Sequence, residues 1–187
     1  MLLALQMTEF RNNNMNTNTL EISTNGVKQR KPFSRLGYTK LETAELVETL
    51  NKLLANYSVH YQKLRNFHWN VKGADFFDIH EQFENQYNTA KIAIDDIAER
   101  IRVFGQTPLS TMKEYLENSD LKESGTDMTG MEMVQEILRD YELLLESMFD
   151  VVEKSIDNGD SGTEDVIKGF IKQMEKNHWM FTAFSQK

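Results

Sequence analysis

Residues 76–105 read FFDIHEQFENQYNTAKIAIDDIAERIRVFG, and their pattern sets the architecture of the chain. The apolar side chains recur every three or four residues, as on one face of an α-helix: Phe76, Ile79, Phe83, Tyr87, Ala90, Ile94, Ile97 and Ile101. Asp75 stands where an N-cap belongs, and Gly105 with Pro108 beyond it marks the end. The stretch therefore predicts a long amphipathic helix with one buried face.

Three more long helices are expected on either side of this one. Their starts carry the capping-box pattern, in which Ser or Thr precedes Glu by three residues: Thr39–Glu42, Thr129–Glu132 and Ser161–Glu164. Gly73 and Gly159 mark two of the helix ends. Residues 110–117 predict a short extra helix within the long connection between the second and third helices. The result is an all-α four-helix bundle with one crossover that spans the bundle.

Composition agrees with one helical domain. The chain has 187 residues, 40% hydrophobic and 27% charged, which permits a sizeable core. Two Pro and nine Gly are too few for the turns of a many-stranded β fold. The absence of Cys excludes disulfides, thiolate nucleophiles and iron–sulfur clusters. Since no apolar run suits a membrane span and residues 1–6 are too short for a signal peptide, we expect a cytoplasmic protein.

Charge is unevenly distributed between the two ends of the chain. Residues 1–40 hold six basic and two acidic residues, a net +4, so the other 147 residues carry 15 basic and 27 acidic, a net −12. Residues 1–35 show no helical period and predict a disordered basic tail, followed by a bundle domain over residues 36–187. Contact with DNA phosphates is one use for the basic cluster of the tail, and a solubilising arm is the other: Lys28, Arg30, Lys31 and Arg35.

A second pattern on residues 76–105 concerns ionisable side chains. Four of them fall at about 0°, 40°, 60° and 100° around the helix, on one stripe: His80, Glu84, Asp95 and Glu99. Charges beside apolar residues are costly unless they are paired or bound to a metal. The stripe is thus a metal-binding face or, alternatively, a polar face with Lys91 and Arg100 as salt-bridge partners.

Axial distance limits the metal interpretation. Glu84 and Asp95 are 11 residues apart, or about 16 Å along a helix, which is too far for one metal cluster in one chain. Antiparallel pairing of two such helices about a twofold axis brings His80 and Glu84 opposite Asp95 and Glu99 of the other copy. We expect that axis near the small residues at positions 89–90, Thr89 and Ala90. Imidazoles with carboxylates suit non-haem iron or manganese.

The motifs of this region resemble a known family. The run His68-Trp69-Asn70-x-x-Gly73-x-x-Phe76-x-x-x-His80-x-x-x-Glu84, followed by Asp95-x-x-Ala98-Glu99-Arg100, is similar to the signature of the Dps proteins. These are miniferritins named for DNA protection during starvation. The similarity extends over about 145 of the 187 residues. It implies a ferritin-like bundle.

The resemblance also implies a function and a set of site residues. Dps proteins form hollow homododecamers from twofold dimers, oxidise Fe²⁺ preferably with hydrogen peroxide, and store a ferric mineral that keeps iron from damaging DNA. Each intersubunit ferroxidase site takes two iron ions. Carried over by position, the metal ligands, which are also the catalytic residues, are His68, His80 and Glu84 of one subunit with Asp95 and Glu99 of its partner. The usual residue at the position of Glu84 is Asp, which puts the coordination of the second iron in doubt.

The resemblance further implies acidic iron-entry pores near the junction of the third and fourth helices, where Asp160 and Asp165 lie. Helix capping and solvated surface are the alternative for both. We expect Trp69 to pack over the metal site and His60 to be a core or interface residue. A di-iron carboxylate bundle would need two Glu-x-x-His motifs, and only Glu175-x-x-His178 is present, so His178 is expected to be structural. If the tail binds DNA, the protein is nucleoid-associated.

Overall fold

A computed structural model describes residues 34–186, and this part of the chain is all-helical. Lys28, Arg30 and Lys31 of the predicted DNA-binding cluster, and the side chain of Arg35, lie outside the described residues. The elements in chain order are a short 3₁₀ helix η1 (Ser34–Gly37), then α1 (Ala44–Asn70), α2 (Phe76–Val103), α3 (Met112–Asn118), α4 (Gly130–Asn158) and α5 (Ser161–Ser185). No described helix is long and apolar enough to cross a membrane.

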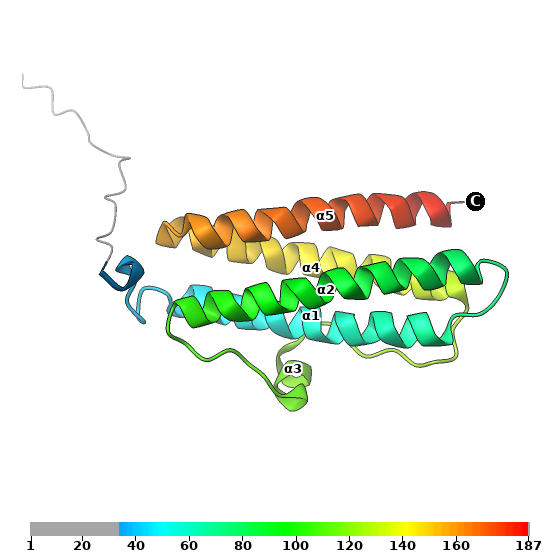
Figure 1. Ribbon diagram of the computed structural model, residues 1–187, viewed down its shortest axis with the longest axis horizontal. Coiled ribbons are helices and arrows are strands. Elements are labelled where there is room, and N and C mark those ends of the chain that lie inside the picture. The colour runs from blue at the N-terminus through cyan, green and yellow to red at the C-terminus, as the bar shows by residue number, and fades with distance from the viewer. Residues whose placement is uncertain (1–33, 187) are drawn as a thin grey trace, which may run out of the picture. The chain divides into compact units, whose positions relative to one another are not determined.

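The four long helices lie side by side, as Figure 1 shows. α1 and α2 form one antiparallel pair, and α4 and α5 form the other. The connection from α2 to α4 runs the length of the bundle, so these two helices point the same way. This arrangement confirms the predicted four-helix bundle with an extra helix, α3, in the crossover.

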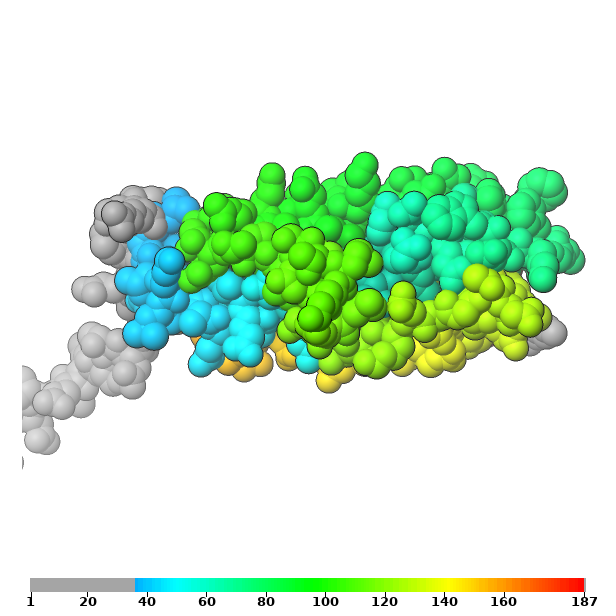
Figure 2. Space-filling view, turned by 90° about the horizontal axis from the view of Figure 1, so that it is seen from below, coloured from blue at the N-terminus to red at the C-terminus, as the bar shows by residue number. Residues whose placement is uncertain are grey.

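The crossover is attached to α1 through side-chain amides. Asn51 Oδ1 accepts a hydrogen bond from the backbone N–H of Leu109 at 2.9 Å. The buried Asn56 accepts from the Ser119 hydroxyl at 3.0 Å and from the N–H of Asp120 at 2.8 Å. Figure 2 shows the crossover lying across α1. These bonds satisfy backbone groups in a segment that has little regular structure of its own.

The helix ends show where local chemistry sets the boundaries. Thr129 forms the predicted capping box with Glu132, and Gly159 adopts the left-handed conformation at φ 66° after α4. The predicted start of α5 was one residue late, since Asp160 is the N-cap and accepts from the N–H of Thr163. Asp75 occupies the N-cap position of α2, but its side chain makes no capping bond.

The first capping box also differs from the prediction. Thr39 and Glu42 exchange the expected bonds, with Glu42 Oε2 accepting from the N–H of Thr39 at 2.9 Å. The regular helix nevertheless begins only at Ala44. The intervening residues form turns, and the buried Thr43 donates its hydroxyl to the Thr39 carbonyl at 3.1 Å.

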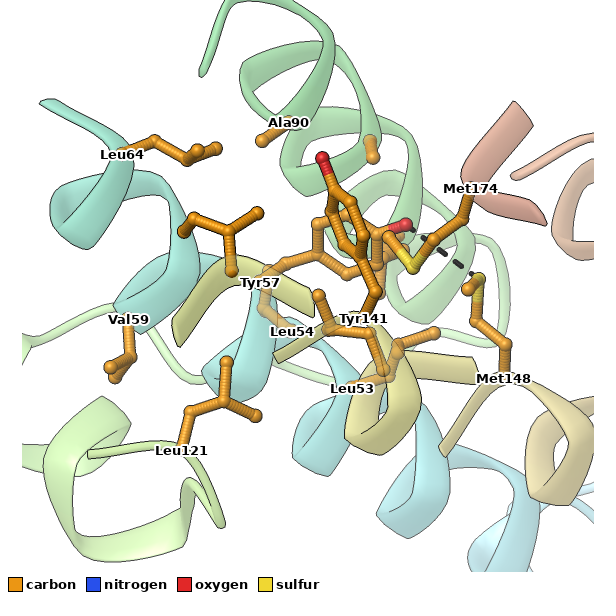
Figure 3. Packing of buried hydrophobic residues seen from close by; sticks show 14 of the residues in the cluster. Leu53, Leu54, Tyr57, Val59, Leu64, Ala90, Leu121, Tyr141, Met148 and Met174 are labelled. Atoms are coloured by element: carbon orange, nitrogen blue, oxygen red, sulfur yellow. Dashed lines mark hydrogen bonds between the residues drawn. The ribbon is translucent and has the colours of Figure 1, made fainter. Parts of the chain in front are cut away.

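The core contains two buried tyrosines in different environments, which Figure 3 shows. The Tyr57 hydroxyl donates to the sulfur of Met148 at 3.6 Å, and burial raises the pKa of Tyr57. The hydroxyl of Tyr141 is buried without a hydrogen-bond partner in the part of the chain described. Around the two rings pack apolar side chains from all four long helices, including Leu53, Ala90 and Met174.

A buried network of charges joins α1 to α4. The His60 Nδ1 donates to Asp140 Oδ2 at 2.9 Å, and Lys63 Nζ donates to Asp140 Oδ1 at 2.6 Å. Lys63 also donates to Glu136 Oε1 at 3.1 Å. The buried side chains of His60, Lys63 and Asp140 are thereby paired with one another. His60 is thus a core histidine, as predicted.

Candidate metal centre

Three of the five predicted ligands come together within one chain. His68 lies in the last turn of α1, and His80 and Glu84 lie one turn apart near the start of α2. One ligand atom from each of the three lies within 4.8 Å of the others. The short connection between α1 and α2 brings the two ends side by side, so residues 12 positions apart face each other.

The two imidazoles hold each other in place. His68 Nδ1 donates to the backbone carbonyl of His80 at 2.9 Å, and His80 Nδ1 donates to the backbone carbonyl of His68 at 2.8 Å. Because a carbonyl only accepts, each Nδ1 must carry a proton, which leaves Nε2 as the nitrogen of each ring that can bind a metal. The rings stack with centroids 3.8 Å apart. This pattern orients histidines for metal binding through Nε2.

A tyrosine that the sequence analysis placed only in the apolar stripe also touches this cluster. The Tyr87 hydroxyl donates to Glu84 Oε1 at 3.3 Å, and its ring lies edge-on to His68 with centroids 5.4 Å apart. Burial and the nearby Glu84 carboxylate raise the pKa of Tyr87. The spacing of three residues between Glu84 and Tyr87 on a predicted helix was the signal for this contact.

The cluster opens outward from the bundle. His68 is 8% exposed, His80 is half-buried and Glu84 is exposed. Exposure thus increases from His68 to Glu84, so the carboxylate faces the surface while α1 and α2 hold the imidazoles in place. Two imidazole nitrogens and one carboxylate leave room for further ligands on the outer side.

The other two predicted ligands lie further along α2. Asp95 and Glu99 are both exposed, and neither forms an ion pair or hydrogen bond within residues 34–186. The salt-bridged alternative is wrong for this stretch, because Arg100 pairs with Asp160 at 2.9 Å and Lys91 forms no ion pair with any described residue. One chain therefore supplies two carboxylates, Asp95 and Glu99, that have no ion-pair partner among the described residues and lie at a distance from its own histidines.

The expected position of the twofold contact needs correction. Ala90 is 3% exposed and faces the bundle core, so it does not lie on the outer face of α2. Thr89, the other residue of that assignment, is exposed, as are Asn88 and Lys91. Thr89 therefore lies on the outer face of α2, where the twofold contact stays a prediction, and only Ala90 was assigned to the wrong face.

The two predicted pore residues have different surroundings. Asp160 is 2% exposed, accepts two hydrogen bonds from Arg100, and caps α5. Its carboxylate is therefore engaged within the chain, as the capping alternative states, and does not line a pore. Asp165 is exposed on the first turns of α5, where the pore assignment stays a prediction.

Trp69 does not pack over the cluster within its own chain. It is 58% exposed, and the Arg65 guanidinium lies 4.7 Å from its ring centroid. With Met112 and Leu116 it lines a groove of about 300 Å³ between α1 and α3. His178 lies on α5, its side chain is within 3.4 Å of the Thr182 hydroxyl, and it is not a member of the cluster.

Comparison with known proteins gives the class first. The bundle and its outward His and carboxylate cluster are those of a ferritin-like protein, and a family model described as the ferritin-like domain matches residues 47–187. The crystal structure of Dps from Staphylococcus aureus superposes with a TM-score of 0.75 at 36% identity, over 77% of this chain and 97% of that one. The crystal structure of the Dps protein from Vibrio cholerae O1, described as a member of a broad superfamily of ferritin-like diiron-carboxylate proteins, gives a TM-score of 0.79 at 30% identity, over 86% of this chain and 100% of that one.

Sequence relatives narrow the class to a family. DNA protection during starvation protein 2 of Bacillus anthracis is 43% identical over 140 residues, which are 75% of this chain and 96% of that protein. General stress protein 20U of Bacillus subtilis is 39% identical over 140 residues, 75% of this chain and 97% of that protein. The chain belongs to the Dps family of the ferritin-like superfamily.

Proposed function

We propose that this protein is a ferroxidase that oxidises Fe²⁺ with hydrogen peroxide and stores the ferric product inside a homododecameric shell. The observation that carries the proposal is the convergence of His68, His80 and Glu84 to within 4.8 Å, with both Nε2 atoms left for metal. Removal of free iron and peroxide together protects DNA from hydroxyl radicals. A cytoplasmic location follows from this role.

Two copies of the chain would complete each site. In an antiparallel pairing of two α2 helices, His80 and Glu84 stand opposite the partner subunit's Glu99 and Asp95. The same register sets Asn88 opposite the partner's Lys91, a polar pair without like-charge repulsion. Since Asp95 and Glu99 are exposed and unpaired within the described chain, they are free for this role.

The five side chains then bind two ferrous ions, which are the substrate. His68 with the partner's Asp95 and Glu99 holds the first ion, and His80 and Glu84 assist the second. The anionic carboxylates favour Fe³⁺ over Fe²⁺, which makes loss of an electron easier. Two ferrous ions supply the two electrons that cleave the O–O bond of one peroxide, and hydrolysis of the ferric product to oxyhydroxide releases four protons to solvent.

The test is sedimentation velocity on the purified protein before and after anaerobic Fe²⁺ loading and peroxide addition. Twelve copies of the 21.8 kDa chain give a particle of about 260 kDa, and we expect it to gain mass with iron. A monomer that takes up no iron would contradict both the shell and the intersubunit site. Peroxide consumption of one per two Fe²⁺ supports the stated oxidant, and unchanged peroxide contradicts it.

The basic tail favours DNA binding as a second function, added to iron oxidation. Residues 1–40 carry a net +4 on every chain, while the remainder carries −12. Twelve copies of the cluster Lys28, Arg30, Lys31 and Arg35 on one shell would contact phosphates multivalently, with strong salt dependence. A gel shift at low salt, with and without residues 1–35, tests this: no shift with the full chain contradicts it.

A further inference from the structure

We infer that Tyr87 is a positioning residue. It holds the carboxylate of Glu84, whose side chain is one methylene longer than the usual Asp, where the carboxylate can bind a metal. The inference rests on the proposed function, because it concerns the same site. Tyr87 itself supplies no metal ligand, and the inference assigns it a role in placing one.

The contacts of Tyr87 connect two ligands from two helices. Its hydroxyl donates to Glu84 Oε1 at 3.3 Å within α2, and its ring lies edge-on to the His68 ring of α1 at 5.4 Å. The far side of the tyrosine ring is supported by Tyr61, edge-on with centroids 6.1 Å apart, and Arg65 lies 5.4 Å from the Tyr61 ring centroid. The hydroxyl is thus carried by a ring that is itself held in place.

Glu84 needs such a support more than a shorter carboxylate would. It is exposed, and an exposed glutamate has three side-chain torsions to order before it binds a metal. A hydrogen bond to Oε1 selects rotamers that point toward the histidines and leaves Oε2 unengaged for the ion. An aspartate at position 84 is one methylene shorter, so its carboxylate is drawn back toward the helix and away from the Tyr87 hydroxyl.

The experiment is a double-mutant cycle on assembled protein. Zn²⁺ and Co²⁺ are the probes, with affinity measured by calorimetry and coordination by the visible absorption of Co²⁺. The variants are Tyr87→Phe, Glu84→Asp and the two combined, with Tyr61→Phe as the matched control. The control removes a hydroxyl from the neighbouring ring, which contacts Tyr87 but not Glu84. Phe keeps the ring packing in both cases, so each variant tests the hydroxyl alone.

We expect Tyr87→Phe to weaken Zn²⁺ binding by about 10-fold and to alter the Co²⁺ spectrum in the Glu84 background. In the Glu84→Asp background the same substitution should change affinity by less than about twofold, because the hydroxyl has no carboxylate within reach. Tyr61→Phe should leave both measurements unchanged. Equal losses of Zn²⁺ affinity in the two backgrounds, or no loss in either, would overturn the inference. The proposed function would still stand in that case, provided that the wild-type shell binds the metal. Failure of the wild-type shell to bind either metal would instead overturn the proposed function and the inference with it.

Discussion

The reciprocal hydrogen bonds between His68 and His80 make the orientation of each ring depend on the backbone of the other helix. We expect His68→Ala, and likewise Glu99→Ala, to slow Fe²⁺ oxidation by more than about 100-fold, since loss of a mere supporting partner costs roughly 10- to 100-fold in metal affinity or activity. Stopped-flow absorbance of the ferric product measures the rate, and sedimentation checks that the shell is still assembled. His178→Ala is the matched control, because His178 lies outside the cluster. Normal oxidation by either ligand variant would contradict the assignment.

Also at the level of single residues, Tyr141 and Asp140 are adjacent but differ in how their polar atoms are paired. The Tyr141 hydroxyl is buried without a partner among the described residues, so Tyr141→Phe should leave the free energy of unfolding unchanged or raise it. Asp140→Ala should lower that free energy by about 3–5 kcal/mol, because it leaves the buried Lys63 charge without its closest partner. Thermal unfolding of both variants measures the contrast, and a large loss in Tyr141→Phe would contradict the assigned packing.

At the level of the helix, the capping box of α4 links stability to pH. Hydrogen bonds from the backbone N–H and the hydroxyl of Thr129 hold the pKa of Glu132 below its ordinary value of 4.5. A lowered folded-state pKa means that the ionised form stabilises the fold above pH 4.5 and that this contribution is lost as the pH falls through the folded pKa. Glu132→Gln should therefore lower stability at pH 7 and show no deficit below the folded pKa.

The measurement for the capping box is thermal unfolding as a function of pH. Glu142→Gln provides the control, since Glu142 is exposed on the same helix and makes no hydrogen bond or ion pair with the described residues. It changes the net charge equally without touching a cap. An identical pH profile for the two variants would show that net charge, and not the cap, accounts for the effect.

At the level of the whole molecule, sites shared between subunits can be tested by mixing two inactive variants. In a dimer of one His68→Ala chain with one Glu99→Ala chain, one site carries both substitutions and the other carries neither. Random pairing of equal amounts should therefore restore about a quarter of the wild-type sites, and of the oxidation rate. The two shells are dissociated, mixed and reassembled, and the rate is compared with that of each variant treated alone. A mixture no more active than its parts would place all ligands of a site in one chain.

The helices and the members of the candidate metal cluster could be predicted from sequence alone, because their signals are local. Apolar periodicity, the Thr129 cap and Gly159 each act within a few residues, and the stripe on α2 with its His and carboxylate spacing was visible from the resemblance and from the helical angle. Even here the α5 cap moved by one residue, from Ser161 to Asp160, since both residue types are good caps.

Only the tertiary structure decided which specific contacts those side chains make. It set the reciprocal hydrogen bonds between His68 and His80, paired Asp160 with Arg100, and placed the Tyr87 hydroxyl against Glu84. Each outcome depends on how far a helix is rotated about its axis and on distances between residues remote in sequence. Those quantities follow from packing the whole core at once, and no local pattern contains them.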